Sequence, residues 1–211
     1  MLMISKGAVF FQAGEEMLRS KPLSDGTFDH NSYSSPDSVN SLKWNNLNNE
    51  AYQNVYNYYK GLIAFRQAHP ALHMTSAEDV KANITPVDGL ENGVLAFHIA
   101  AGANGEAQDM FVIFNPNAAA TDVALPDGEW TIYVNADKAG TEALGTTQGK
   151  ASVEPISAMV LIRTGEAKEI PAETPAETSN IGKTAGIIAG VAAAAAAVGA
   201  VAIAVSKKRK K

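Results

Sequence analysis

Two neighbouring carboxylates, Glu15 and Glu16, are the side chains near the start of the chain that could take part in acid–base chemistry. They follow Ala8–Gln12, a short apolar run whose pattern predicts a strand buried on both faces. A carboxylate at the end of a barrel strand is often catalytic. Adjacent residues of a strand point to opposite faces, however, so the two glutamates could not act as a pair.

A long polar loop is predicted for residues 20–48, which are rich in Asn, Ser, Asp and Pro. Loops of this length are usually functional or disordered. Arg19 and Lys21 could either donate hydrogen bonds to sugar hydroxyls or hold the loop through carboxylates. His30 is the only histidine of the loop, and a structural role is more common for such a residue than metal binding.

No cofactor is expected from this loop. Ca²⁺ is a weak alternative, because the loop aspartates fit no known calcium-binding spacing; they are Asp25, Asp29 and Asp37. The chain has no cysteine, which excludes disulfides and thiolate metal sites. Its net charge is -5 and no basic face is evident, so a nucleic-acid partner is not expected.

Two hydrophobic periods predict the elements that position this loop. Glu50–Gln67 carries apolar residues at helical spacing, with Asn48 or Asn49 as the cap and His69-Pro70 as the end. After Pro70 the period changes to two, and turn dipeptides separate short strands. The predicted strands span residues 94–101, 110–115, 121–125, 130–135 and 158–163. Several short strands of this kind favour a β-sandwich.

The last part of the chain has a composition of its own. Ile187 to Val205 is a run of 19 residues that contains only Ile, Val, Ala and Gly. A helix of this length roughly spans a hydrocarbon core of about 30 Å. Basic residues at 207–211 follow it, which favours a cytoplasmic C-terminus. The alternatives are a buried alanine helix of a soluble protein and a sorting signal, although the usual Leu-Pro-x-Thr-Gly motif is absent.

Three blocks of the sequence resemble type I pullulanases, in the same order and at the same spacing. They read GAVFFQAGEEMLRSK from Gly7, DHNSYSSPDSVNSLKW from Asp29 and YKGLIAFRQAHPAL from Tyr59. The resemblance covers residues 1–164 and implies the C-terminal end of an α-amylase-clan glycoside hydrolase of family 13. In that clan a small β-sandwich follows an eight-fold β/α barrel. Ala8–Gln12 would be the eighth barrel strand and Glu50–Gln67 the eighth helix.

The resemblance implies a debranching enzyme that hydrolyses α-1,6-glucosidic bonds in pullulan, starch or glycogen. The three catalytic carboxylates of the clan come from strands before the eighth, so they would precede Met1. No residue here is expected to be catalytic, Glu15 and Glu16 included, and the isolated chain is predicted to be inactive. Loop residues are expected to contact α-glucan instead, and the candidates are Asp37, Asn40, Arg19, Asn31 and Tyr33.

The predicted fold class is thus an α/β fragment of a TIM-type barrel, followed by an all-β sandwich and one C-terminal transmembrane helix. The expected parts are the barrel end (1–69), the β-sandwich (70–164), a linker (165–182), the membrane helix (183–206) and a basic tail (207–211). The chain would lie at the cell surface, anchored in the plasma membrane, with a separately encoded N-terminal part of the enzyme as a partner.

Two rival functions and one rival site stay open at this point. The chain could instead be a non-catalytic surface module that binds carbohydrate or tethers. Another enzyme of the clan, such as an α-amylase, is disfavoured by the block NSYSSPDSVN. Trp44 and Trp130 are expected in the core, with a starch platform at Trp130 as the alternative.

Overall fold

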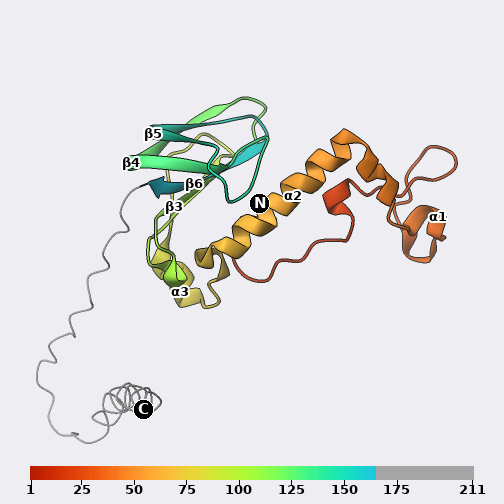
Figure 1. Cartoon of the computed structure of the whole chain (residues 1–211), viewed down its shortest axis with the longest axis horizontal. Helices are drawn as coiled ribbons and strands as arrows, with labels where there is room; N and C mark the ends of the chain where they lie inside the picture. Colours follow the sequence, from red (N-terminus) through yellow and green to blue (C-terminus); the bar gives the residue numbers. More distant parts are fainter. Residues whose placement is uncertain (165–211) are drawn as a thin grey trace, which may run out of the picture. The chain divides into compact units, whose positions relative to one another are not determined.

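The computed structural model describes residues 1–164, and its dominant element is an antiparallel β-sheet (Figure 1). The strand order within this part of the chain is β1-β2-β3-β6-β4-β5. The strands are β1 (Ile84–Pro86), β2 (Leu95–Ile99), β3 (Met110–Asn115), β4 (Thr121–Val134), β5 (Gly145–Val153) and β6 (Ser157–Thr164). Every residue of β3 is buried, because both faces of the sheet centre are covered.

A bend in β4 folds the sheet into two layers. The register between β4 and β5 shifts between Ala124 and Glu129, and Gly128 in the bend has a φ of 117°. The first half of β4 then packs over the central strands. One core cluster therefore joins Val123 to Phe111 on the opposing strand. This arrangement confirms the predicted β-sandwich.

The other face of the sheet packs against helix α2 (Glu50–Ala68). The Asn49 side chain caps this helix by accepting a hydrogen bond from the Ala51 backbone N–H at 2.9 Å, as the sequence predicts. Phe65 is fully buried in the core that α2 shares with the sheet. Tyr58 and Leu62, on the same stripe of the helix, pack at its edge.

A close approach fixes α2 against the connection between β4 and β5. A Cβ at Gly61 would lie 1.9 Å from the Ala139 carbonyl oxygen, so only glycine fits there. One helical turn earlier, the Tyr58 hydroxyl donates a hydrogen bond of 2.8 Å to the Asn135 carbonyl. Helix and sandwich thus touch through backbone as well as side chains.

Short helices make up most of the remaining regular structure. The α-helices α1 (Asp37–Asn40) and α3 (Ala77–Asn83) were not predicted. The 3-10 turns span Leu2–Ile4, Glu15–Met17, Ser32–Ser34, Trp44–Asn48, Pro70–His73 and Ala103–Gly105. Sequence periodicity is a poor guide to elements of one or two turns.

The predicted strand at Ala8–Gln12 is wrong, since these residues have no strand conformation. A strand needs a neighbour to accept and donate its backbone hydrogen bonds, and no strand of the described residues lies beside this segment. Within residues 1–164 no helix is long and apolar enough to cross a membrane. The predicted linker, membrane helix and basic tail, residues 165–211, lie outside the described residues.

Candidate substrate-binding loop

The polar loop begins at a tight turn in which Gly14 has a φ of 100°. A Cβ at Gly14 would lie 2.7 Å from the Cβ of Arg19, so the absence of a side chain lets Arg19 pack across the turn. The Arg19 guanidinium donates to the Ala13 carbonyl at 3.1 Å and also to the Asn40 carbonyl. Arg19 therefore joins the start of the loop to its far end.

Asn40 completes this connection from α1. Its side-chain amide donates to the carbonyls of Ser32 and Ser35, at 2.6 Å and 2.9 Å. Lys21 donates a hydrogen bond to the Ser32 hydroxyl from the opposite side. Ser32 is buried as a result. Two of the predicted substrate-binding residues, Arg19 and Asn40, thus donate these hydrogen bonds to backbone carbonyls of the loop and of the turn before it.

Asp29 organises the middle of the loop. Its carboxylate accepts a hydrogen bond of 2.8 Å from the Asn31 backbone N–H and another from the Ser35 hydroxyl. The hydrogen bond from Ser35, followed by that from Asn31, lowers the pKa of Asp29 below its usual range. The carboxylate is consequently ionised at neutral pH. Sequence reasoning missed this role, although the spacing Asp29-x-Asn31 is typical of an Asx-turn.

The side chains of the other three predicted substrate-binding residues lie outside this network of hydrogen bonds. Tyr33 is 92% exposed, and Asn31 and Asp37 are exposed as well. The five predicted substrate-binding residues therefore fall into two groups. Arg19 and Asn40 form the loop framework, and Asn31, Tyr33 and Asp37 are exposed. The exposed members offer an amide, a carboxylate and an aromatic ring to solvent, which suits hydrogen bonding to sugar hydroxyls and stacking on a sugar face.

The paired glutamates Glu15 and Glu16 accept hydrogen bonds from the backbone of their own turn. The Gln12 backbone N–H donates to the Glu15 carboxylate at 3.0 Å, and the Gly14 N–H donates to Glu16 at 2.8 Å. Both carboxylates cap their own turn. Burial, and after it the negative charges of Glu15 and Glu16, raise the pKa of Tyr59 on α2.

The two tryptophans differ in environment. Trp130 is fully buried in the sandwich, which confirms its core placement and rules out a starch platform there. Trp44 is 60% exposed, so its predicted core placement is wrong for the described residues. It lies in the 3-10 turn Trp44–Asn48, just before α2, and this turn has no buried residue.

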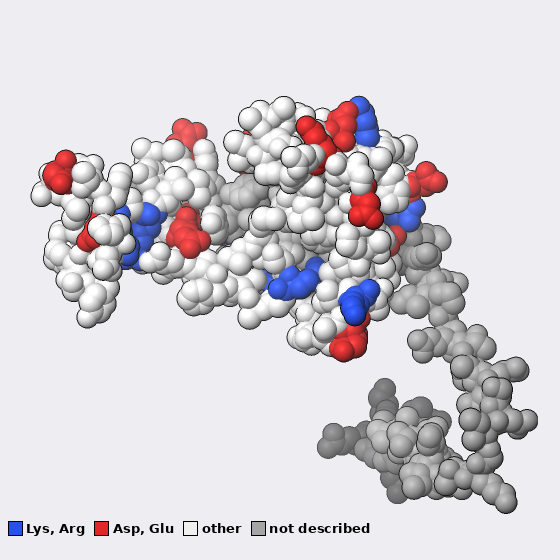
Figure 2. All heavy atoms as spheres, turned by 180° about the vertical axis from the view of Figure 1, so that it is seen from behind, with Lys and Arg blue, Asp and Glu red and all other residues white. Residues whose placement is uncertain are grey.

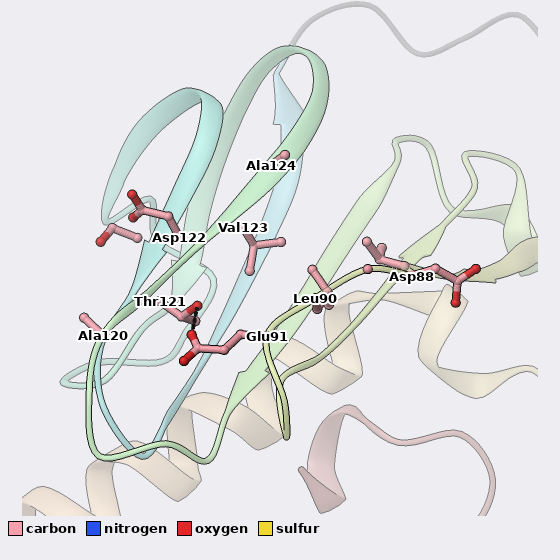
Figure 3. A pocket seen from close by; sticks show the side chains of 11 residues that line it. Asp88, Leu90, Glu91, Ala120, Thr121, Asp122, Val123 and Ala124 are labelled. Carbon is pink, nitrogen blue, oxygen red and sulfur yellow. Dashed lines mark hydrogen bonds between the residues drawn. The ribbon is translucent and has the colours of Figure 1, made fainter.

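A second concave region lies on the sandwich, between the β1–β2 connection and β4 (Figure 3). Its volume is about 690 Å³, and Asp88, Glu91 and Asp122 line it. Glu91 accepts a hydrogen bond of 3.0 Å from Thr121. The hydrogen bond from Lys150 is the largest cause that lowers the pKa of Asp122. All three of these residues are exposed to solvent.

Charge on the surface is mixed in sign. On the face shown in Figure 2, Lys and Arg side chains are interspersed with Asp and Glu side chains. Within residues 1–164 no group of three or more His, Asp or Glu side chains is placed to hold a metal ion. Of the aspartates considered for Ca²⁺, Asp25 accepts a hydrogen bond from Thr27 and Asp29 accepts one from Ser35, whereas Asp37 is exposed.

Comparisons with known proteins agree with this architecture. Residues 80–138 match the family model of the pullulanase all-beta domain. A pullulanase from Bacillus subtilis (strain 168) is 28% identical over 127 residues, which cover 60% of this chain and 17% of that protein. The solved pullulanase from Bacillus acidopullulyticus is 34% identical, with a TM-score of 0.69 over 77% of this chain and 19% of that chain.

A third relative is a pullulanase variant from Paenibacillus barengoltzii, solved in complex with maltotriose. It is 29% identical, with a TM-score of 0.63 over 77% of this chain and 24% of that chain. The chain thus spans about a fifth of the length of the relatives it matches. The chain is therefore similar to pullulanases in both sequence and fold. These matches support a fragment of a pullulanase-type glycoside hydrolase.

The loop framework leads to a first testable prediction. Replacing Asn40 by Ala removes both donors to the Ser32 and Ser35 carbonyls. We expect the loop to open more easily, by about 1–3 kcal/mol, because these acceptors lose their partners. Faster chymotryptic cleavage after Tyr33 would show this. Asn31→Ala is the matched control, since it alters an exposed amide; equal cleavage of both variants would contradict the framework role.

Proposed function

We propose that this chain is the C-terminal part of a debranching enzyme that hydrolyses α-1,6-glucosidic bonds in pullulan, starch or glycogen. Residues 1–69 would complete a catalytic barrel and residues 70–164 would form its terminal sandwich. The catalytic carboxylates would come from the preceding part of the barrel. The similarity to pullulanases, one of which is solved with maltotriose, supports α-glucan as the substrate class.

The observation that carries this proposal is an uncovered apolar surface on residues 1–69. Phe10 is 89% exposed, Phe28 66% and Trp44 60%. Helix α2 is rich in aromatic and aliphatic residues, yet Phe65 is its only buried residue within the described chain. Large exposed apolar patches mark interaction sites. A preceding barrel segment packed against residues 1–69 would cover this surface.

The polar loop has a specific place in such an assembly. In a β/α barrel the loop that follows a strand emerges at the active-site face. Arg19 and Asn40 would hold the loop, while Asn31, Tyr33 and Asp37 would contact the glucose units of the substrate. The exposed positions of the last three residues support this division.

Reconstitution tests the proposal. The chain is produced together with the barrel segment encoded upstream in the same genome, as two polypeptides, and reducing ends released from pullulan are counted. We expect activity only with both parts. Phe10→Asp should abolish it by charging the docking surface, whereas Ile156→Asp, on an exposed sandwich turn, should not. A genome without such a barrel segment, or equal loss in both variants, would contradict the proposal.

We also propose that the chain is anchored at the cell surface. The apolar run Ile187–Val205 and the basic residues 207–211 support anchoring in the plasma membrane, with the sandwich outside the cell. Cells from the reconstitution experiment provide the test when the chain carries a secretion signal. The chain should sediment with membranes, and deleting residues 182–211 should release it. Recovery of the intact chain in the soluble fraction would contradict the anchoring.

A further inference from the structure

Lys6 occupies an unusual position in the segment that precedes the candidate loop. Its Nζ atom is buried and has no hydrogen-bond partner within the described residues. The amine lies 5.9 Å from the centroid of the Phe97 ring on β2, so the side chain reaches the sandwich. Arg66 of α2 holds the neighbouring backbone by donating to the carbonyls of Met3, Ser5 and Gly7, at 3.0, 2.7 and 2.9 Å.

The charged groups around Lys6 do not satisfy it. The Arg66 guanidinium repels the Lys6 ammonium, while the Glu106 carboxylate attracts it. Glu106 is already engaged, because His69 Nδ1 lies 3.3 Å from both of its oxygens and the Ala71 N–H lies 3.5 Å away. The described elements that meet here are the N-terminal segment, the end of α2, β2 and the turn before β3. The amine is therefore buried over the face of the Phe97 ring with no hydrogen-bond partner among the described residues.

We propose that Lys6 makes the packing of residues 3–7 against α2 and the sandwich dependent on pH. The junction is weakest while the amine carries its charge and becomes firmer when the amine loses its proton. Because residues 3–7 lead directly into the turn at Gly14, the attachment of the candidate loop follows the same dependence. This inference concerns the fold of the chain and holds whether or not the assembled protein hydrolyses glucan.

The direction of the effect follows from linkage. Burial, and after it the Arg66 charge, lower the pKa of Lys6 from 10.5 to about 8, while Glu106 acts in the opposite direction. Between these two values the unfolded chain binds more protons than the folded chain, so stability rises with pH in this window. Below pH 8 the amine is charged in both states and the penalty is at its full size.

The test compares the full chain with Lys6→Met, which keeps the length of the side chain but removes the charge. Urea unfolding is measured at pH 7.5 and pH 9.5. Between these pH values, the folding equilibrium constant of the original chain should rise about tenfold more than that of Lys6→Met. Solvent partly screens the Lys6 charge, so this rise is smaller than the full pKa difference would give. Lys6→Met should also be the more stable of the two at pH 7.5.

Two controls keep the outcome specific to Lys6. Lys81→Met alters an exposed lysine on α3 and should retain the full pH dependence. Burial also lowers the pKa of the Met1 amine, but this group is present in every variant and cancels in the comparison. Equal pH dependence in the original chain and Lys6→Met, or lower stability of Lys6→Met at pH 7.5, would overturn the proposal.

Discussion

Incubated alone with pullulan, the purified 211-residue chain is expected to release no reducing ends above background. Retaining glycoside hydrolysis needs two carboxyl groups about 5 Å apart, one ionised and one protonated. Glu15 and Glu16 are not expected to supply this pair, because both carboxylates accept hydrogen bonds from the backbone of their own turn and we assign them a structural role. Removing such groups from an enzyme commonly lowers the rate by several orders of magnitude.

A double variant gives this prediction a sharp control. Glu15→Gln with Glu16→Gln keeps the shape of the turn while removing both acids, and its background should equal that of the original chain. Reducing ends are counted for both proteins at equal concentration. Hydrolysis by the original chain that disappears in the double variant would show that these glutamates are catalytic, and our assignment of their role would then fail.

Replacing Trp130 by Ala is expected to cost about 3–5 kcal/mol of folding free energy, the usual range for large buried aromatic residues. Trp130 is fully buried, and its indole N–H donates to the Pro126 carbonyl at 2.9 Å. Its ring packs edge-on against Phe111 at 5.8 Å, and the Arg163 guanidinium lies 5.8 Å from the ring centroid. Such a loss is a large share of the total stability of a domain, about 5–15 kcal/mol.

Urea unfolding followed by circular dichroism measures this loss. Tyr33→Ala is the matched control, because it removes an aromatic ring that is 92% exposed, and it should change the unfolding free energy very little. A loss below about 1 kcal/mol for Trp130→Ala would mean that the bent half of β4 holds its place without the indole.

Elements with a strong local pattern could be predicted from the sequence. The bounds of β3 agree with the prediction, and α2 differs from it by one residue, because continuous apolar runs and helical spacing identify such elements directly. β5 was missed, since GTTQGKASV is mostly polar and carries two glycines. It pairs with β4 at the edge of the sheet, where an apolar face is not required. β4 was predicted as two strands, because Pro126 and Gly128 resemble a turn.

The candidate site was predictable only in composition. Polar content predicted the loop, and the resemblance to pullulanases suggested the candidate residues within it, but whether a side chain faces solvent or the loop depends on the turn at Gly14. That turn brings Arg19 to Asn40, which is 21 positions away along the chain. A strand at Ala8–Gln12 would need neighbouring strands to pair with, and an apolar run alone does not provide them. The run is apolar as expected, but the strand predicted from it was wrong.

The contact at Gly61 has a mechanical consequence. The Ala139 carbonyl lies against the helix at this residue, and the Tyr58 hydroxyl donates to the Asn135 carbonyl one turn away, so both contacts resist rolling or sliding of α2 on the sandwich. We therefore expect the helix to move together with the sandwich as one rigid body. A small tilt of the sandwich would be magnified at the far end of α2, where Asn49 and the turn carrying Trp44 connect it to the loop. Any hinge between sandwich and loop must then lie before Glu50, outside the helix itself.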